Sequence, residues 1–251
     1  MVVGVYGLGR FGAFWAQHLA EHFTVTGWSR SSERPTPPGV RRVEEKEVLQ
    51  ADVLVLCVAI SSLEEVLRRI AGQLRPNTLV MDTCSVKMYP VRLMKEILPP
   101  EVEILATHPM FGPDSGSRGL KDLPLVFSPV RMADESAAAW QERFCKMGLS
   151  VLPLSPEEHD REASITQGIT HFIGRVLGEL ELNESNMATS GYRSLLDIVR
   201  QTCNDPWSLF VDLQKYNPYT VQMRRDVHQA ITVMLERFDS IEAINNGRKN
   251  G

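Results

Sequence analysis

The chain has 251 residues, of which 43% are hydrophobic and 23% charged, as expected for a globular protein of one or two domains. The net charge of −4 and the pI near 5.9 give no electrostatic reason to expect nucleic acid or an anionic membrane as a partner. No secretory signal or membrane-spanning apolar stretch is evident, and the four cysteines lack CxxC spacing. We therefore expect a cytoplasmic protein with reduced thiols, no metal site and no membrane contact.

The N-terminal residues show a strand, a glycine-rich turn, a helix and a second strand. Residues 2–6 have the length and β-branching of a buried strand, residues 13–22 have helical periodicity, and residues 23–28 form the next strand. The GxGxxG motif in this setting predicts a dinucleotide site with phosphates at the helix N-terminus. Its residues are Gly7, Leu8, Gly9, Arg10, Phe11 and Gly12. The alternative is that these glycines serve only a tight turn.

The end of the second predicted strand indicates which nicotinamide cofactor is bound. NAD sites usually place an acidic residue there for the ribose 2′-hydroxyl, whereas this chain has Ser29, Arg30 and Ser31. A cation flanked by hydroxyls suits a 2′-phosphate, so NADP is favoured over NAD. The alternative is that Arg30 is a solvated loop residue and Glu33 binds the ribose.

Strands and helices continue to alternate up to residue 154. Apolar runs predict strands at residues 52–59, 78–82, 102–106, 124–128 and 150–154, with helical segments between most of them. The pattern predicts an α/β fold with a Rossmann-type doubly wound parallel sheet. We assign residues 1–154 to this NADP-binding domain.

Two polar residues follow successive predicted strands, at the edge where an open α/β sheet forms its crevice. Ser85 comes after residues 78–82, and His108 comes after residues 102–106, where two prolines and a glycine restrict the following backbone. We predict that both are catalytic groups in one crevice. Each has a structural alternative, Ser85 as the N-cap of the next helix and His108 as part of a stiff surface turn.

Only helical patterns are found from residue 155 onward. They cover residues 157–180, 190–201, 206–215 and 218–239. Ser164, Gln167 and His171 share one face of the first helix, which predicts a ligand contact or, alternatively, a solvent-facing stripe. Because these apolar helices have few partners within the chain, we predict an all-α dimerisation domain at residues 155–251 and a homodimer.

Five sequence blocks resemble the prephenate/arogenate dehydrogenase family of tyrosine biosynthesis, and most closely its plant-like arogenate dehydrogenase branch. The blocks are residues 7–12, 82–87, 107–116, 166–177 and 191–196. They occur in the order of the family, so the resemblance extends from residue 2 to about residue 240.

The resemblance implies an NADP-dependent oxidative decarboxylation of prephenate, arogenate or both. Hydride leaves the carbinol carbon of a cyclohexadienyl ring, carbon dioxide follows, and the ring becomes aromatic. It implies that His108 takes the proton of the ring hydroxyl and that Ser85 holds that hydroxyl beside it. His171 is implied as a contact to a substrate carboxylate, with Gln167 assisting one turn away.

The chain departs from the family at two positions. Many members place an arginine after the block that begins at Gly191, and here Arg200 is the candidate, with Arg193 as an alternative and Asp197 competing for the same place. Ala188 stands where plant-like members carry Asn or Asp, and an alanine offers no charge to the arogenate ammonium. This second departure favours prephenate slightly over arogenate.

Two other functions fit parts of the sequence. β-Hydroxyacid and imine reductases share the N-terminal fold and a helical second half, but rely on a lysine in the first long helix there, where this chain has His171 and no lysine. A non-catalytic NADP-binding sensor is the third hypothesis, since fold alone does not establish activity. The presence of both Ser85 and His108 argues against it.

Overall fold

The computed structural model describes residues 1–249. The chain divides into two compact units, the first comprising Met1–Asp160 and the second beginning at Arg161. The division therefore lies a few residues beyond the boundary that we placed at residue 154.

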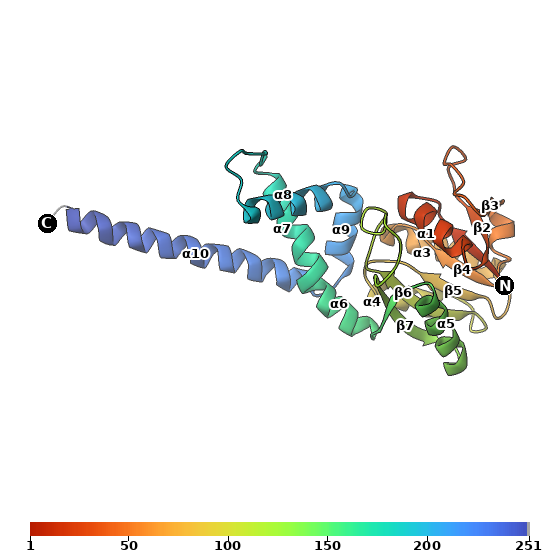
Figure 1. The fold of residues 1–251 in the computed structure, drawn as a ribbon. Helices are drawn as coiled ribbons and strands as arrows, with labels where there is room; N and C mark the ends of the chain where they lie inside the picture. The colour runs from red at the N-terminus through yellow and green to blue at the C-terminus, as the bar shows by residue number, and fades with distance from the viewer. Residues whose placement is uncertain (250–251) are drawn as a thin grey trace. The chain divides into compact units, whose positions relative to one another are not determined.

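The first unit contains an eight-stranded sheet in the order β3-β2-β1-β4-β5-β6-β7-β8 (Figure 1). The strands are β1 Val2–Tyr6, β2 Thr24–Trp28, β3 Val40–Arg42, β4 Val53–Leu56, β5 Leu79–Asp82, β6 Glu103–Pro109, β7 Pro124–Arg131 and β8 Ser150–Pro153. The strand order reverses direction between β1 and β4, which lie side by side and parallel. This topology confirms the Rossmann-type doubly wound fold, whose crevice opens at that reversal.

Helices cover both faces of the sheet, because strand side chains alternate between the faces. The helices are α1 Arg10–Ala20, α2 Glu45–Val48, α3 Leu63–Ile70, α4 Met88–Ile97 and α5 Asp134–Lys146, followed by α6 Pro156–Ala163 across the division between the units. Trp15 of α1 and Phe144 of α5 stack and share one buried cluster with Val3 and Val5 of β1. Tyr6, also buried, projects toward the opposite face of the sheet.

The sheet differs from the predicted parallel arrangement at one side. β7 runs antiparallel to β6, with His108 opposite Val126. The β6–β7 connection, residues 110–123, contains turns and no helix, so it need not form the helical crossover that joins parallel strands. Pairing with β7 extends β6 to Pro109, so His108 lies within the strand rather than beyond it.

The second unit contains only helices within residues 161–249. After α6 come a π-helical turn Ser164–Gly168, α7 Ile169–Gly178, α8 Ser190–Cys203, α9 Trp207–Tyr216 and α10 Thr220–Lys249. The single helix expected at residues 157–180 is thus a continuous helical run over residues 156–178 that contains a π-helical turn. The Gly168 carbonyl accepts a hydrogen bond from Gln214 Nε2 at 2.9 Å, an alternative partner to its own helix.

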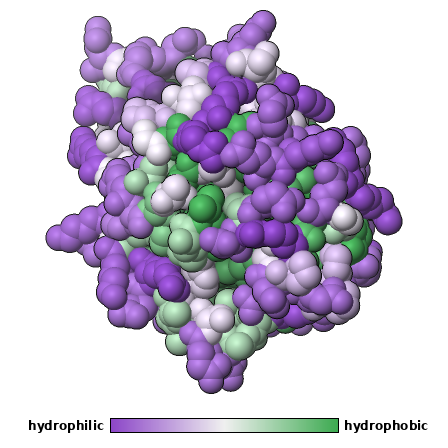
Figure 2. Space-filling model, turned by 90° about the vertical axis from the view of Figure 1, so that its right-hand side faces the viewer, coloured by the Kyte–Doolittle hydropathy of each residue, from purple (hydrophilic) through white to green (hydrophobic). Residues whose placement is uncertain are grey.

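Hydrophilic residues cover most of the face drawn in Figure 2, with hydrophobic residues gathered nearer its middle. Within residues 1–249, no helix combines the length and the apolar character needed to cross a membrane.

Candidate active site

The glycine-rich turn after β1 tolerates no side chain at two of its positions. Gly7 has a φ of +110°, and a Cβ there would lie 2.3 Å from the Cys57 carbonyl oxygen at the end of β4. A Cβ on Gly12 would lie 1.8 Å from the Gly7 carbonyl oxygen. Both distances are far below van der Waals contact, so the close approach of α1 to the sheet requires glycine.

The N-terminus of α1 is free to receive an anion. Gly9 is its N-cap, no side chain caps the helix, and the first turn contains no acidic residue. The backbone N–H groups there fit a pyrophosphate. Leu8 is buried and Phe11 packs against the core, whereas Arg10 is exposed and pairs with Asp114 at 2.5 Å.

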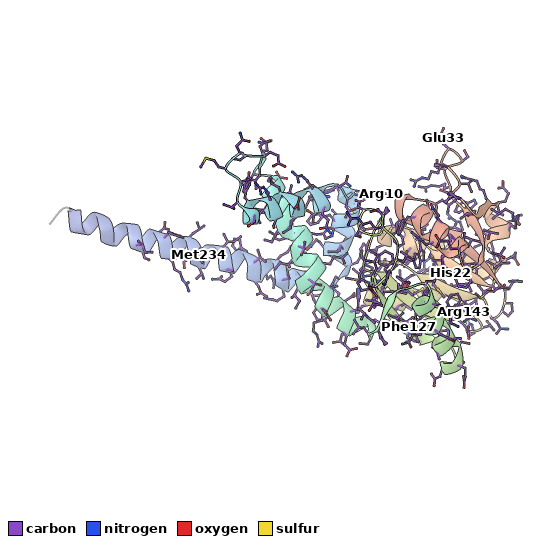
Figure 3. The ribbon with its side chains drawn as sticks, viewed as in Figure 1. Arg10, His22, Glu33, Phe127, Arg143 and Met234 are labelled. Atoms are coloured by element: carbon purple, nitrogen blue, oxygen red, sulfur yellow. The ribbon has the colours of Figure 1, made fainter. Side chains whose placement is uncertain are left out.

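The loop after β2 carries the residues predicted to select the cofactor. Ser29 is half-buried, whereas Arg30 and Ser31 are exposed. Glu33, the alternative ribose ligand, lies at the tip of the loop (Figure 3). Sequence reasoning did not single out Arg34 and Arg42, which the fold brings to the same loop.

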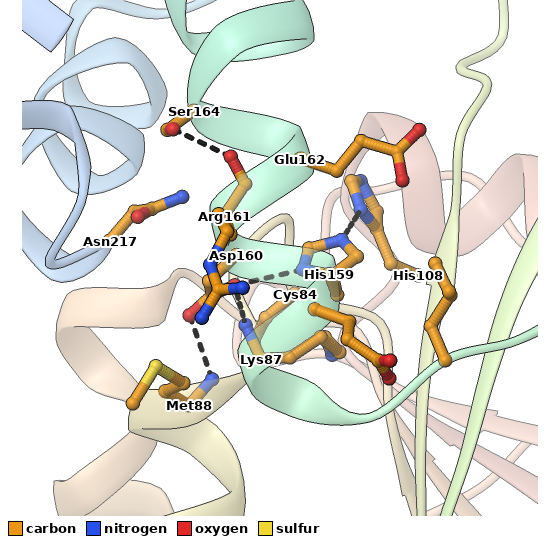
Figure 4. A network of polar contacts seen from close by, with 12 residues as sticks. Cys84, Lys87, Met88, His108, His159, Asp160, Arg161, Glu162, Ser164 and Asn217 are labelled. Carbon is orange, nitrogen blue, oxygen red and sulfur yellow. Dashed lines mark hydrogen bonds and ion pairs between the residues drawn. The ribbon is translucent and has the colours of Figure 1, made fainter.

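His108 is the first member of a buried polar chain (Figure 4). Its side chain is almost fully buried, and its Nδ1 lies 2.8 Å from His159 Nε2. His159 Nδ1 in turn lies 2.8 Å from Asp160 Oδ1. The Asp160 carboxylate also accepts the backbone N–H groups of Lys87 at 2.6 Å and Met88 at 2.9 Å, which anchors it at the start of α4.

These contacts assign the tautomers of both imidazoles. A carboxylate only accepts hydrogen bonds, so His159 donates its Nδ1–H to Asp160 and presents the lone pair of Nε2. His108 must then donate Nδ1–H to His159. This leaves a lone pair on His108 Nε2, and no described residue is bonded to that atom. The chain therefore holds His108 as a neutral base with a defined proton-accepting atom.

A buried ion pair lies beside this histidine. The Lys87 ammonium donates to Asp82 and, at 2.6 Å, to the carbonyl of Thr107, the residue before His108. Both Lys87 and Asp82 are fully buried. Burial and the Lys87 charge together hold the pKa of His108 well below its ordinary value of 6.5. His108 therefore remains neutral at physiological pH.

Ser85 lies beyond the end of β5, and β5 pairs directly with β6, the strand of His108. Its Oγ is buried and has no hydrogen-bond partner among the residues that the structure describes. The predicted N-cap role is not seen, because the residue at the N-cap position of α4 is Lys87 and the Asp160 carboxylate accepts the N–H groups there. Burying a hydroxyl without a hydrogen-bond partner lowers the stability of the fold, and a hydrogen bond to a substrate oxygen would offset that loss.

The three predicted substrate contacts of the helical half belong to the second unit. Gln167 Oε1 and His171 Nδ1 are buried, and neither atom has a hydrogen-bond partner in the described part of the chain. Burial and Arg175 lower the pKa of His171, although Asp205 acts in the opposite direction. Ser164, by contrast, donates to the Arg161 carbonyl at 2.7 Å.

Arg200 is exposed, and its guanidinium is already engaged by Asp197 at 2.9 Å and by Glu184. A substrate carboxylate there would have to displace these partners. Arg175, which sequence reasoning did not single out, has a buried Nε without a partner and lies against the rings of Trp207 and Phe210.

Two family models match this chain, one within the first unit and one within the second. A family model described as "Prephenate dehydrogenase, nucleotide-binding domain" matches residues 23–141. A second model, described as "TYRAAT1-like, C-terminal domain", matches residues 176–246.

Two curated relatives come from Arabidopsis thaliana. The chain is 39% identical over 234 residues to "Arogenate dehydrogenase 2, chloroplastic", covering 88% of this chain and 65% of the relative. It is 34% identical over 240 residues to "Arogenate dehydrogenase 1, chloroplastic", covering 91% of this chain and 38% of the relative. The chain thus spans less than two thirds of the length of either relative.

A solved structure shares the fold. It is a prephenate dehydrogenase from A. aeolicus in complex with hydroxyphenyl propionate and NAD+, with a TM-score of 0.74 and 17% identity, and the match covers 97% of this chain and 92% of that chain. The sequence blocks, the family models and the plant relatives agree with one another and with this fold. Over most of its length, the chain is similar to the prephenate/arogenate dehydrogenases.

Proposed function

We propose that this chain catalyses the oxidative decarboxylation of prephenate or arogenate in tyrosine biosynthesis, with hydride transfer to NADP. The observation that carries the proposal is the buried His108, which the His159–Asp160 pair holds in one tautomer with the Nε2 lone pair available. The names of the plant relatives support the same chemistry.

In this reaction His108 Nε2 accepts the proton of the ring 4-hydroxyl as the carbinol carbon becomes a carbonyl carbon. A nicotinamide held at the glycine-rich turn would supply the acceptor for the hydride that leaves that carbon. The bond to the ring carboxylate then breaks, carbon dioxide leaves, and the electron pair enters the ring, which becomes a phenol after its oxygen takes a proton. Ser85 Oγ, buried and unpartnered, donates to the ring oxygen and holds it in position.

The cofactor fits the residues present. The uncapped start of α1 and the side-chain-free Gly9 provide a cradle for the pyrophosphate. Arg30, together with Ser29 and Ser31, supports NADP rather than NAD, because these side chains suit a 2′-phosphate.

We assign a substrate carboxylate contact to His171, whose buried Nδ1 has no partner among the described residues. Gln167 is assigned an assisting role one turn away, since its buried Oε1 can only accept a hydrogen bond. Arg200 is the weaker candidate, since acidic side chains already occupy its guanidinium. The absence of charge at Ala188 favours prephenate, whereas the plant relatives are named for arogenate. Those relatives are also named as chloroplastic, so the cytoplasmic location of this chain remains a prediction.

We also propose a homodimer formed through the second unit. Exposed apolar side chains on α10 include Ile231, Met234, Phe238 and Ile241, spaced alternately by three and four residues (Figure 3 labels Met234). Each is 48% to 58% exposed. This spacing is that of a seam between packed helices, and a second copy of the chain would cover it.

The test is a spectrophotometric assay of the purified chain with NADP+ and either prephenate or arogenate. We expect absorbance to rise at ~340 nm, where the reduced nicotinamide absorbs and the oxidised form does not. A chain that binds NADP+ but gives no rise with either substrate would instead fit a non-catalytic sensor.

A further inference from the structure

The segment from the end of β2 through β3 is strongly cationic. From Ser29 to Arg42 it contains four arginines, of which Arg41 and Arg42 lie in β3, and a single carboxylate, Glu33. Arg41 is paired with Glu47 of α2 at 2.6 Å. The other three arginines form no ion pair within the described chain, and the proposed chemistry assigns a role only to Arg30.

Arg42 is folded back onto the loop. Its guanidinium donates to the carbonyls of Arg34 and Ser31, the latter at 2.7 Å, and reaches the Ser29 carbonyl at 3.5 Å. The Arg42 side chain thus bridges three backbone carbonyls of residues 29–34, the segment predicted to select the cofactor. Because β3 pairs with β2 and places Arg42 opposite Gly27, the bridge is fixed to the sheet.

Arg34 lies over the glycine-rich turn. Its Nη1 is 3.4 Å from the Leu8 carbonyl oxygen and 3.1 Å from the position that a Cβ on Gly9 would occupy. The guanidinium is exposed and no carboxylate neutralises it. Arg30 and Arg34 are therefore two unpaired cations on the loop that adjoins the dinucleotide turn.

We propose that Arg34 is a second direct ligand of the NADP 2′-phosphate, beside Arg30, and that Arg42 is a positioning residue that shapes the loop for both. The inference rests on the proposed function, in that it assumes this chain binds NADP. A phosphate dianion takes two guanidinium groups well, because each offers a planar fork of donors. NAD lacks that phosphate and gains nothing from Arg34.

The experiment titrates the full chain calorimetrically with 2′,5′-ADP, which carries the 2′-phosphate, and with 5′-ADP, which does not. We expect Arg34→Ala to weaken 2′,5′-ADP about 10- to 100-fold, the range for a hydrogen bond to a charged group, with 5′-ADP changed less than about twofold. The matched control is Arg41→Ala, which removes the same charge from the neighbouring strand and leaves both affinities unchanged.

Two outcomes overturn the assignment of Arg34. One is an unchanged affinity for 2′,5′-ADP, and the other is an equal loss for both ligands, which would place Arg34 on the diphosphate instead. The proposed function fails separately. If the Arg34 result is as expected but neither prephenate nor arogenate drives NADP+ reduction, the phosphate site stands and the dehydrogenase does not.

Arg42→Lys tests the positioning role. A lysine keeps the charge but cannot bridge three carbonyls from one planar group. We expect the preference for 2′,5′-ADP over 5′-ADP to fall about tenfold while the thermal midpoint changes little. If instead the midpoint falls and both ligands weaken equally, Arg42 only supports the fold and its positioning role is refuted.

Discussion

His159→Phe is the substitution that most directly tests how His108 is held. His159 is buried, with 2% of its surface exposed, and both of its ring nitrogens are bonded at 2.8 Å. Phenylalanine keeps a ring of similar size and removes both bonds. His108 Nδ1–H then has no acceptor, and neither its tautomer nor its ring orientation is fixed.

The bond to the Asp160 carboxylate is charge-assisted, worth ~1.5–3 kcal/mol, and the bond to His108 is neutral, worth ~0.5–1.5 kcal/mol. We therefore expect a loss of about 2–4 kcal/mol in unfolding free energy. General-base catalysis as a whole contributes about 10²–10⁴-fold. His108→Ala should lose that factor, and His159→Phe a smaller part of it, roughly tenfold or more.

The pH dependence gives a readout that simple destabilisation does not. Activity requires neutral His108, so it falls as the pH drops through the pKa of that residue. Burial and the Lys87 charge lower that pKa in the wild type and the variant alike. The variant also loses the His159 Nε2 acceptor, which favours the protonated imidazole by accepting its Nδ1–H. The pKa therefore falls further, and the acid limb of kcat/KM moves to lower pH than in the wild type.

The assay is a kcat/KM profile for wild type, His159→Phe and the exposed-surface control His22→Phe, which should match the wild type. The double variant His108→Ala/His159→Phe should be no slower than His108→Ala alone, because His159 acts only through His108. Additive losses in the double variant, or an acid limb that does not move, would refute the positioning of His108 by His159.

Three further outcomes are expected. Arg30→Ala should weaken NADP about tenfold in equilibrium binding and leave NAD nearly unchanged, whereas an equal loss would point back to Glu33. Gly12→Ala should lower the thermal midpoint and abolish dinucleotide binding, because its Cβ would lie 1.8 Å from a backbone oxygen, while Gly72→Ala, with open space around it, should do neither. Phe238→Asp should convert a dimer to a monomer in analytical ultracentrifugation, and a variant that stays dimeric would exclude that face of α10 as the seam.

The fold of the first unit was predictable because its signals are local. The GxGxxG turn between a strand and a helix, and the buried runs of β4 and β5, each depend on neighbouring residues only. The antiparallel course of β7 was not predictable, because an apolar strand has the same pattern in either direction. The π-helical turn was not predictable either, and the Gly168 carbonyl at its end is bonded by Gln214, which is 46 residues away.

In the candidate site, too, the residues with a local sequence signal were predictable and those that depend on distant contacts were not. Ser85 and His108 were identified because each follows or ends a predicted strand. His159 and Asp160 were missed, since His159 lies 51 residues from its partner His108 and has no pattern of its own. Arg34 was missed for a related reason, because its proximity to Gly9 depends on how the loop returns across the turn.

The buried ion pair and the polar chain act on His108 in complementary ways. A carboxylate bonded directly to an imidazole would stabilise its protonated form and raise its pKa. Here Asp160 reaches His108 only through His159, so it fixes the tautomer from one ring farther away. Lys87 is closer to the backbone of His108 and opposes protonation, while Asp82 provides the partner without which a buried ammonium would be very costly. The site thus orients a base with a carboxylate while keeping that base unprotonated.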